Sequence, residues 1–343
     1  KGLSAKTSLN RYARNIYQKN FNLPYDMTLF NTSGGNGHIV GDQPTGPRAR
    51  AAVDFLNSRY DKIERYQFNA QLNYKRNFGL HGVDALVVYE QAEQDDIDFN
   101  AQRNDFISPA IDQYIGGSTV GATANGSEEQ SARISYVGLV SYNYDQKYLL
   151  EGSFRYDGSV IFAPENRWGF FPSVSAGWKI SSEPFFSNVK FVDDLKLRAS
   201  VGLLGNDQVG NFQWLQSYNI ITGGAVFGDL QQGLEAGVLP NRAITWEKSL
   251  TYNFGLDGTF LNNMINFKGD VFFRHTYDIL GDREESVPST LGASLPDENY
   301  REIDSKGFEI ELGYNNKIGS SINYYIRGNF GYAVNKVIRT NEP

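Results

Sequence analysis

The nine residues Tyr-Gln-Phe-Asn-Ala-Gln-Leu-Asn-Tyr at positions 66–74 decide the fold. Every second residue is aromatic or apolar, and the residues between them are glutamine or asparagine. Successive side chains of a β-strand point to opposite faces, so this alternation predicts a strand with one apolar face and one amide face.

Similar two-faced segments recur along the whole chain. They lie at residues 3–9, 83–90, 134–144, 148–156, 170–180, 195–203, 248–256, 265–273, 308–314 and 322–332. Together they predict about eleven strands of roughly ten residues, the length that a tilted strand needs to cross a bilayer. Strands of soluble sandwiches are usually nearer five or six residues. The pattern therefore favours an all-β, antiparallel fold of long strands.

The composition agrees with this prediction. The 343 residues include 21 Tyr, 23 Phe and 35 Gly but only 2 Met, which favours strands and turns over helices. There is no Cys, so neither a disulfide nor a thiolate metal site can form. The net charge of −7 arises from interspersed acids and bases. Without a basic block, the sequence gives no indication of nucleic-acid binding.

If this chain crosses a membrane, the sequence predicts that it does so as a β-barrel and not with helices. No run of 18 apolar residues occurs, whereas a membrane helix needs about 20. Barrel strands alternate, which fits the low mean hydropathy of −0.44. In such a barrel one side of the 66–74 strand should face lipid and the other the lumen or a plug. The lipid set is Tyr66, Phe68, Ala70, Leu72 and Tyr74, and the lumen set is Gln67, Asn69, Gln71 and Asn73.

The predicted connections alternate in length, as in outer-membrane barrels, whose long loops lie outside the cell. The long ones are residues 12–64, 94–131, 205–244 and 279–306; the short ones are 79–82, 145–147, 258–263 and 317–321. Residues 158–169 form a further connection, and residues 181–194 form one of medium length. Aromatic residues near the strand ends suit interfacial girdles. The alternative is the core of a soluble β protein, which would leave amide faces covering a very large surface.

Several motifs, spaced over most of the chain, carry a family resemblance. They are Tyr-Asp-Gly-Ser (156–159), Phe-Ala-Pro-Glu-Asn-Arg-Trp-Gly-Phe-Phe-Pro-Ser-Val-Ser-Ala-Gly-Trp (162–178), Leu-Lys-Leu-Arg-Ala-Ser (195–200) with Gly202, Gly205 and Asn206, Thr-Trp-Glu-Lys (245–248) and Lys-Gly-Phe-Glu (306–309). This set closely resembles the SusC/RagA family of TonB-linked outer-membrane transporters of Bacteroidota. One departure is Val160-Ile161, where members commonly have Ser-Arg.

The resemblance implies that residues 1–343 are a segment of the transporter barrel, about half of a 22-stranded one. A plug domain, a TonB box and an N-terminal extension would then lie upstream of Lys1, and further strands would follow Pro343. We expect two open edges in such a segment, because a complete barrel closes on itself in lipid.

The resemblance also implies a function, which is uptake of oligosaccharides across the outer membrane. A SusD-like surface lipoprotein would act as a lid, and TonB–ExbB–ExbD would supply energy through the missing plug. A dimer of SusC–SusD pairs is part of the same expectation. Three alternatives stay open: a RagA-like peptide importer, a passive porin or structural surface barrel, and a soluble all-β binding module.

The sequence gives no catalytic or cofactor motif, so we expect no enzyme and no cofactor. His38, His81 and His275 are scattered, and no Cys can join them as zinc ligands. The acidic residues 95–98 could supply calcium ligands but lack the spacing of a calcium loop, so a solvated loop is preferred. Neighbouring acids such as Glu284-Glu285 do not define a glycosidase pair.

One loop gives a ligand-binding hypothesis. Phe212, Trp214 and Tyr218 lie among glycine and amide residues, and an aromatic face beside amides suits a sugar. The alternative is packing of the loop against a neighbour. We also expect residues 167–173 to mark re-entry of a strand from an outside loop, with Pro172 ending ladder pairing and Trp168 at the interface. Asp157 and Arg167 should approach each other across that loop.

Overall fold

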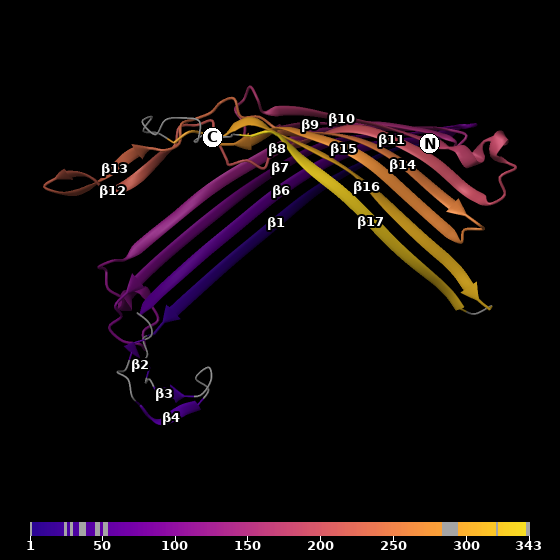
Figure 1. Ribbon diagram of the computed structural model, residues 1–343. Coiled ribbons are helices and arrows are strands. Elements are labelled where there is room, and N and C mark those ends of the chain that lie inside the picture. The colour runs from indigo at the N-terminus through magenta and orange to yellow at the C-terminus, as the bar shows by residue number, and fades with distance from the viewer. Residues whose placement is uncertain are drawn as a thin grey trace. The chain divides into compact units, whose positions relative to one another are not determined.

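In this computed structural model the described residues are 2–23, 26–27, 30–33, 39–44, 49–50, 54–282, 294–319 and 322–340. Eleven strands form one sheet in the order β1-β6-β7-β8-β9-β10-β11-β14-β15-β16-β17 (Figure 1). They are β1 (Leu3–Asn22), β6 (Phe55–Phe78), β7 (His81–Asn104), β8 (Thr123–Tyr144), β9 (Tyr148–Ser159), β10 (Trp168–Lys179), β11 (Val192–Asn206), β14 (Glu247–Phe260), β15 (Ile265–Gly281), β16 (Glu298–Ile318) and β17 (Ile322–Arg339). Every pairing from β8 to β17 is antiparallel.

The predicted number of strands is confirmed, but the predicted lengths are wrong. The strands of the sheet have 12 to 24 residues, because they continue where the apolar alternation has already stopped. Three pairs of short strands also lie in connections that the sequence indicated as loops. They are β2 (Asp26–Met27) with β5 (Ala49–Arg50), β3 (Phe30–Ser33) with β4 (Ile39–Pro44), and β12 (Tyr218–Phe227) with β13 (Asp229–Ala236).

The chain divides into two compact units. Unit 1 comprises Lys1–Leu9, Gln67–Ala92 and Ser131–Pro343, and unit 2 comprises Asn10–Tyr66 and Glu93–Gln130. Strands of unit 2 carry charged ladders in place of apolar alternation, with Arg11 paired to Glu64 at 2.7 Å and Lys62 to the same carboxylate at 2.9 Å. Charged residues on both faces of a strand suit water, which is why the sequence pattern did not reveal these extensions.

Unit 1 has one apolar and one polar face, because residues directly opposite one another in a ladder share a face. Trp178 stands opposite both Tyr148 and Leu197, and Leu197 stands opposite Leu256. The exposed large residues of this apolar face include Tyr136, Tyr148, Phe154, Tyr156, Phe170, Val174, Trp178, Leu197, Val201, Tyr252, Phe254, Val271 and Phe330. So wide an exposed apolar surface indicates contact with a membrane.

Segment 66–74 behaves as its alternation predicts. Phe68 and Leu72 are 39% and 47% exposed. On the other face Gln71 Nε2 donates to Asn73 Oδ1 at 2.8 Å, and Gln67 Nε2 donates to Glu90 Oε2 at 2.9 Å. The separation of apolar from amide side chains is therefore confirmed.

Two aromatic belts border the apolar face. Near the long connections Trp168 stacks on Tyr156 at 4.7 Å and on Tyr136 at 6.3 Å. Near the short connections Tyr144 stacks on Tyr148 at 6.4 Å, beside Trp178 of the next strand. Trp168 and Trp178 are ten positions apart on β10. At about 3.3 Å per residue and a tilt of about 40°, this spans about 25 Å, the height of the apolar band of a bacterial barrel.

The predicted alternation of short and long connections is confirmed for the described residues. Strands β8 and β9 meet at a tight turn in which Asp145 and Gln146 have φ of 52° and 53°, as a mirror-image hairpin turn requires. At the other end of the unit 1 strands, residues 160–167 and 207–246 form longer connections. In unit 2, residues 105–122 form a long connection between β7 and β8. None of the described residues forms a helix with the length and apolar character to cross a membrane.

Candidate functional site

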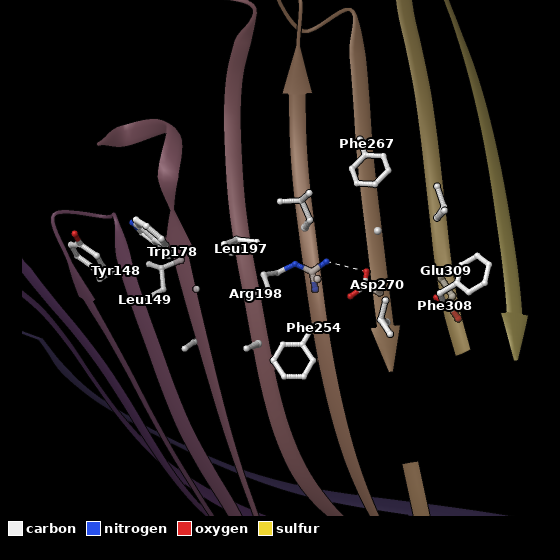
Figure 2. Close-up of a pocket in the computed structure, with 18 residues that line it drawn as sticks. Tyr148, Leu149, Trp178, Leu197, Arg198, Phe254, Phe267, Asp270, Phe308 and Glu309 are labelled. Atoms are coloured by element: carbon white, nitrogen blue, oxygen red, sulfur yellow. Dashed lines mark hydrogen bonds and ion pairs between the residues drawn. The ribbon is translucent and has the colours of Figure 1, made fainter. Parts of the chain in front are cut away.

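The polar face of unit 1 carries charged side chains that neutralise one another across strands. Arg198 of β11 donates to Asp257 of β14 through two bonds of 2.8 and 2.9 Å, and to Asp270 of β15 at 3.0 Å. Figure 2 shows the bond to Asp270. Gly255 leaves room for the guanidinium, because a Cβ there would lie 2.6 Å from Arg198 Cζ. Three strands thus share one charge cluster.

A second cluster lies on the same face nearer the long connections. Arg155 donates to both oxygens of Asp157 at 3.1 and 2.9 Å and to Ser135 Oγ at 3.2 Å. The Asp157 carboxylate pairs with Arg155. Among the described residues no ion pair joins Asp157 to Arg167, whose buried Nε has no hydrogen-bond partner, so the predicted side-chain contact is not formed. The two segments do meet, but through the backbone, where Ser159 N donates to the Arg167 carbonyl at 3.2 Å.

A small hydrophobic cluster joins the connections at this end. Phe162, Phe171, Ile244 and Trp246 are 1%, 6%, 3% and 2% exposed. Trp246 Nε1 also donates to the Arg167 carbonyl at 3.1 Å. Connections 160–167 and 207–246 therefore share a core, which is uncommon for surface loops.

Polar contacts reinforce this junction. Arg242 binds both carboxylate oxygens of Glu165, at 2.9 and 3.1 Å, and its carbonyl accepts from Asn166 Nδ2 at 2.8 Å. A hydrogen bond from the backbone at Glu165, followed by the Arg242 guanidinium, holds the pKa of the Glu165 carboxyl below its usual range. The pair is exposed, so it fixes geometry more than it adds stability.

The connection from β15 to β16 joins the same assembly. Asn299 accepts from Thr245 N and donates to its carbonyl, both at 2.9 Å. Asn241 Nδ2 donates to the Asp297 carbonyl at 2.8 Å, and Gln213 Nε2 to the Asp297 carboxylate at 3.3 Å. Residues of three connections, defined here as the loop platform (160–167, 207–217, 237–246 and 294–299), are thus held in one arrangement.

The three predicted ligand residues lie in or beside the loop platform but do not form one aromatic surface. Phe212 is half-buried with φ of 55°. Trp214 is half-buried with the Arg242 guanidinium 5.5 Å from its ring, and its buried Nε1 has no hydrogen-bond partner among the described residues. Tyr218 begins β12 and is 64% exposed. The contact with Arg242 fits loop packing, whereas a donor without a partner fits ligand binding.

The acidic run 95–98 is not a loop, as the sequence indicated, but part of β7. Its side chains therefore alternate between faces and do not converge. Asp98 is paired with Arg59 at 3.0 Å, and Asp96 accepts from Gln94 at 2.7 Å. No group of three metal-ligating side chains occurs in the described part of the chain. His38 and residues 284–285 lie outside the described residues.

Two further expectations are settled near β10. The strand begins at Trp168, which confirms re-entry at residues 167–173. Pro172 was expected to end ladder pairing, and it does so on one side only. It stands opposite Phe154 of β9, whereas the pairing of β10 with β11 begins at Ser173. Proline lacks an N–H, so it is accepted where one neighbour is absent.

Sequence reasoning missed the residues that build the loop platform. Trp246 and Phe171 lie within the motifs 245–248 and 162–178. Their place in these motifs was the only sequence feature that could have indicated a role. Arg242 and Asn299 carried no signal in the sequence, because their partners are 77 and 54 positions away.

Comparisons with known proteins agree with this geometry. Residues 3–343 match the family model described as TonB dependent receptor-like, beta-barrel. The chain is 30% identical over 322 residues to the TonB-dependent receptor SusC of Bacteroides thetaiotaomicron, covering 90% of the chain and 31% of that relative. It is 29% identical over 342 residues to the TonB-dependent receptor P39 of Formosa agariphila, covering 98% of the chain and 30% of that relative.

Solved structures show the same fold. The structure titled as the RagAB peptide transporter matches with a TM-score of 0.83 at 22% identity, covering 98% of the chain and 35% of that chain. The outer membrane transporter YddB from Escherichia coli matches with a TM-score of 0.57 at 14% identity, covering 98% and 40%. The chain spans about a third of the length of the curated relatives. These matches confirm the expected resemblance to SusC and RagA, and the chain belongs to the TonB-dependent receptor-like β-barrel family of the outer membrane.

Proposed function

We propose that this chain is part of the barrel wall of a TonB-dependent importer that takes up oligosaccharides across the outer membrane. The chain itself carries out no catalysis. Its apolar face contacts lipid, and its polar face lines the route of the cargo. The loop platform stands at the outer end of that route.

The polar face is the observation that carries this proposal. It presents amides and hydroxyls, such as Gln71, Asn73 and Ser200, beside charges that are paired within the wall. Arg198 and Arg155 are both matched by neighbouring carboxylates. A surface that presents amides and hydroxyls beside arginines matched by carboxylates suits a neutral, hydroxyl-rich cargo. An ionic cargo would gain little from it.

Partners and energy source follow from the family. A SusD-like lipoprotein would close the outer entrance, and TonB–ExbB–ExbD would act on a plug domain outside this chain. A dimer of such pairs completes the proposal. The loop platform supports it, because a rigid surface can seat a lid without paying the ordering cost of mobile loops.

A peptide importer is the second candidate. It is favoured by the similarity to the structure titled as the RagAB peptide transporter, although at 22% identity this supports the fold alone. Peptides would use the same polar face through backbone hydrogen bonds.

The test is uptake by cells that carry the full-length gene and its neighbouring lipoprotein gene. Labelled oligosaccharides and labelled oligopeptides of similar mass are supplied separately, with and without functional TonB. TonB-dependent uptake of oligosaccharides alone supports the proposal. TonB-dependent uptake of peptides alone would assign the second candidate.

A deletion of the chain's gene serves as the control. Uptake that persists without TonB but disappears with the gene would indicate a passive porin and would overturn both importer proposals.

A further inference from the structure

A hollow of about 810 Å³ opens on unit 1 (Figure 2). Its lining combines small residues with large rings: Ala176, Ala199 and Gly269 with Trp178, Phe254 and Phe308. The small residues lower the surface between the rings. Most lining side chains are apolar, and the volume lies within the range of about 300–1,000 Å³ typical of ligand sites.

The strand register places this hollow on the apolar face. Ala176 stands opposite Ala199, and Ala199 stands opposite Phe254. Phe254 in turn stands opposite Val271, which stands opposite Phe308. The apolar lining is therefore on the lipid side of the wall. Arg198, Asp270 and Glu309 also border the hollow (Figure 2), but they alternate with these residues along their strands, so their side chains belong to the opposite face.

The boundary with water lies at the end of the hollow near the short connections. Tyr148 Oη and Trp178 Nε1 donate to Glu183 of the connection between β10 and β11, at 2.6 and 3.1 Å. These bonds, the one from Tyr148 first, hold the pKa of Glu183 below its usual range. An ionised carboxylate at this point fixes the edge of the hydrocarbon, because a charge within it is costly.

The same connection has the features of an interfacial anchor. Phe185 and Phe191 are 67% and 59% exposed. Exposing two phenyl rings to water is unfavourable, whereas aromatic side chains are common at a membrane interface. Lys190 lies between them and is exposed. The nearby carboxylates are already engaged: Glu183 with the two aromatic side chains, and Asp194 with Lys179 at 3.1 Å. Among the described residues no carboxylate forms an ion pair with Lys190.

We propose that this region binds a phospholipid of the periplasmic leaflet, with one acyl chain in the hollow and the phosphate beside Lys190. The short connections of such barrels face the periplasm. Trp178, which stands opposite Leu197, belongs to the aromatic belt near the short connections. The hollow therefore lies at the periplasmic edge of the apolar band, on the side of the connection that carries Lys190. An empty hollow would lose dispersion contacts on every lining ring.

The experiment uses the full-length protein purified from outer membranes in mild detergent. Phosphatidylglycerol carrying a photoreactive group in its acyl chain is added, and native mass spectrometry counts the lipid that stays bound. Ala199→Phe fills the hollow, whereas Val201→Phe adds the same ring two positions along the same face and outside the lining. Lys190→Gln removes the cation and leaves the hollow intact. Resistance of each barrel to detergent unfolding at room temperature verifies folding.

Wild type and Val201→Phe should retain lipid and label near residues 197–199 and 254–256. Ala199→Phe should retain about tenfold less, the factor that corresponds to about 1.4 kcal/mol. Lys190→Gln should bind phosphatidylglycerol no better than phosphatidylethanolamine. Equal retention by Ala199→Phe and Val201→Phe would overturn the proposal. Native mass spectra of lipid-free assemblies of two copies, without labelling at residues 197–199, would also overturn it and assign the hollow to an interface between copies.

Discussion

Placing an arginine at Val174 should test the assignment of the two faces most directly. Trp168 and Trp178 mark the belts on β10, and Val174 lies six positions from the first and four from the second. It is thus one residue from their midpoint, or about 2.5 Å in depth at about 3.3 Å per residue and a tilt of about 40°. Arginine on the lipid face at the midplane costs about 2–4 kcal/mol.

Ser175→Arg is the matched control, because Ser175 differs in depth by one residue but lies on the polar face. It stands opposite Glu151, which can pair with the new guanidinium. A second comparison is Phe170→Arg on the apolar face near the outer belt, where the cost falls to about 0–1 kcal/mol. The three variants separate the effect of the face from the effect of depth.

The assay is refolding of the full-length protein into lipid vesicles over a urea series, followed by the folded band on unheated gels. Val174→Arg should lower the folded-to-unfolded ratio roughly 30- to 900-fold, the factors that correspond to about 2–4 kcal/mol. Ser175→Arg should stay near wild type. If both variants are equally damaging, or if Phe170→Arg is as damaging as Val174→Arg, the assignment of the faces fails.

Three further outcomes are expected. Trp246→Ala should destabilise the loop platform by about 3–5 kcal/mol, since it empties a buried aromatic site; faster protease cleavage in residues 207–246 on intact cells would show this, and cleavage at the wild-type rate would contradict it. Trp214→Ala in the full-length protein should weaken oligosaccharide binding about fivefold, the loss of about 1 kcal/mol from one stacking face, with an unchanged melting temperature; calorimetry that finds unchanged affinity would assign Trp214 to loop packing. Glu183→Gln should lower the unfolding midpoint at pH 7, because the pKa of Glu183 is lowered in the folded state by the bond from Tyr148. Such a group stabilises the fold above its unfolded pKa and loses this effect as pH falls through the folded pKa, so wild type and variant should converge in acid; a constant difference would count against the pairing.

The sequence predicted the sheet well where lipid imposes a two-sided environment. Segment 66–74 alternates because one face meets hydrocarbon and the other meets polar groups, and the structure keeps that division. Strand lengths were missed because residues such as Glu64 and Asp98 lie in the parts of β6 and β7 that continue beyond the two-faced segments. Their ladders are held by backbone bonds and ion pairs, which leave no period in hydrophobicity.

The candidate site was predicted less well, because its contacts are long-range. Local composition indicated Trp214 as an aromatic residue in a polar loop, but it could not reveal the guanidinium of Arg242 beside its ring. The motif that contains Trp246 carried the family resemblance, yet only the fold shows that its indole packs on Phe162 at 5.3 Å. Residues 95–98 were predicted as a loop for a related reason. A run of acidic residues is typical of loops, and here it lies in the β7 strand instead.

The charge cluster of Arg198 is complete within the wall, since Asp257 and Asp270 both come from neighbouring strands. A charge left without a partner in a poorly hydrated site costs several kcal/mol. Arg198 therefore stays neutralised whether or not anything lies beside this part of the wall.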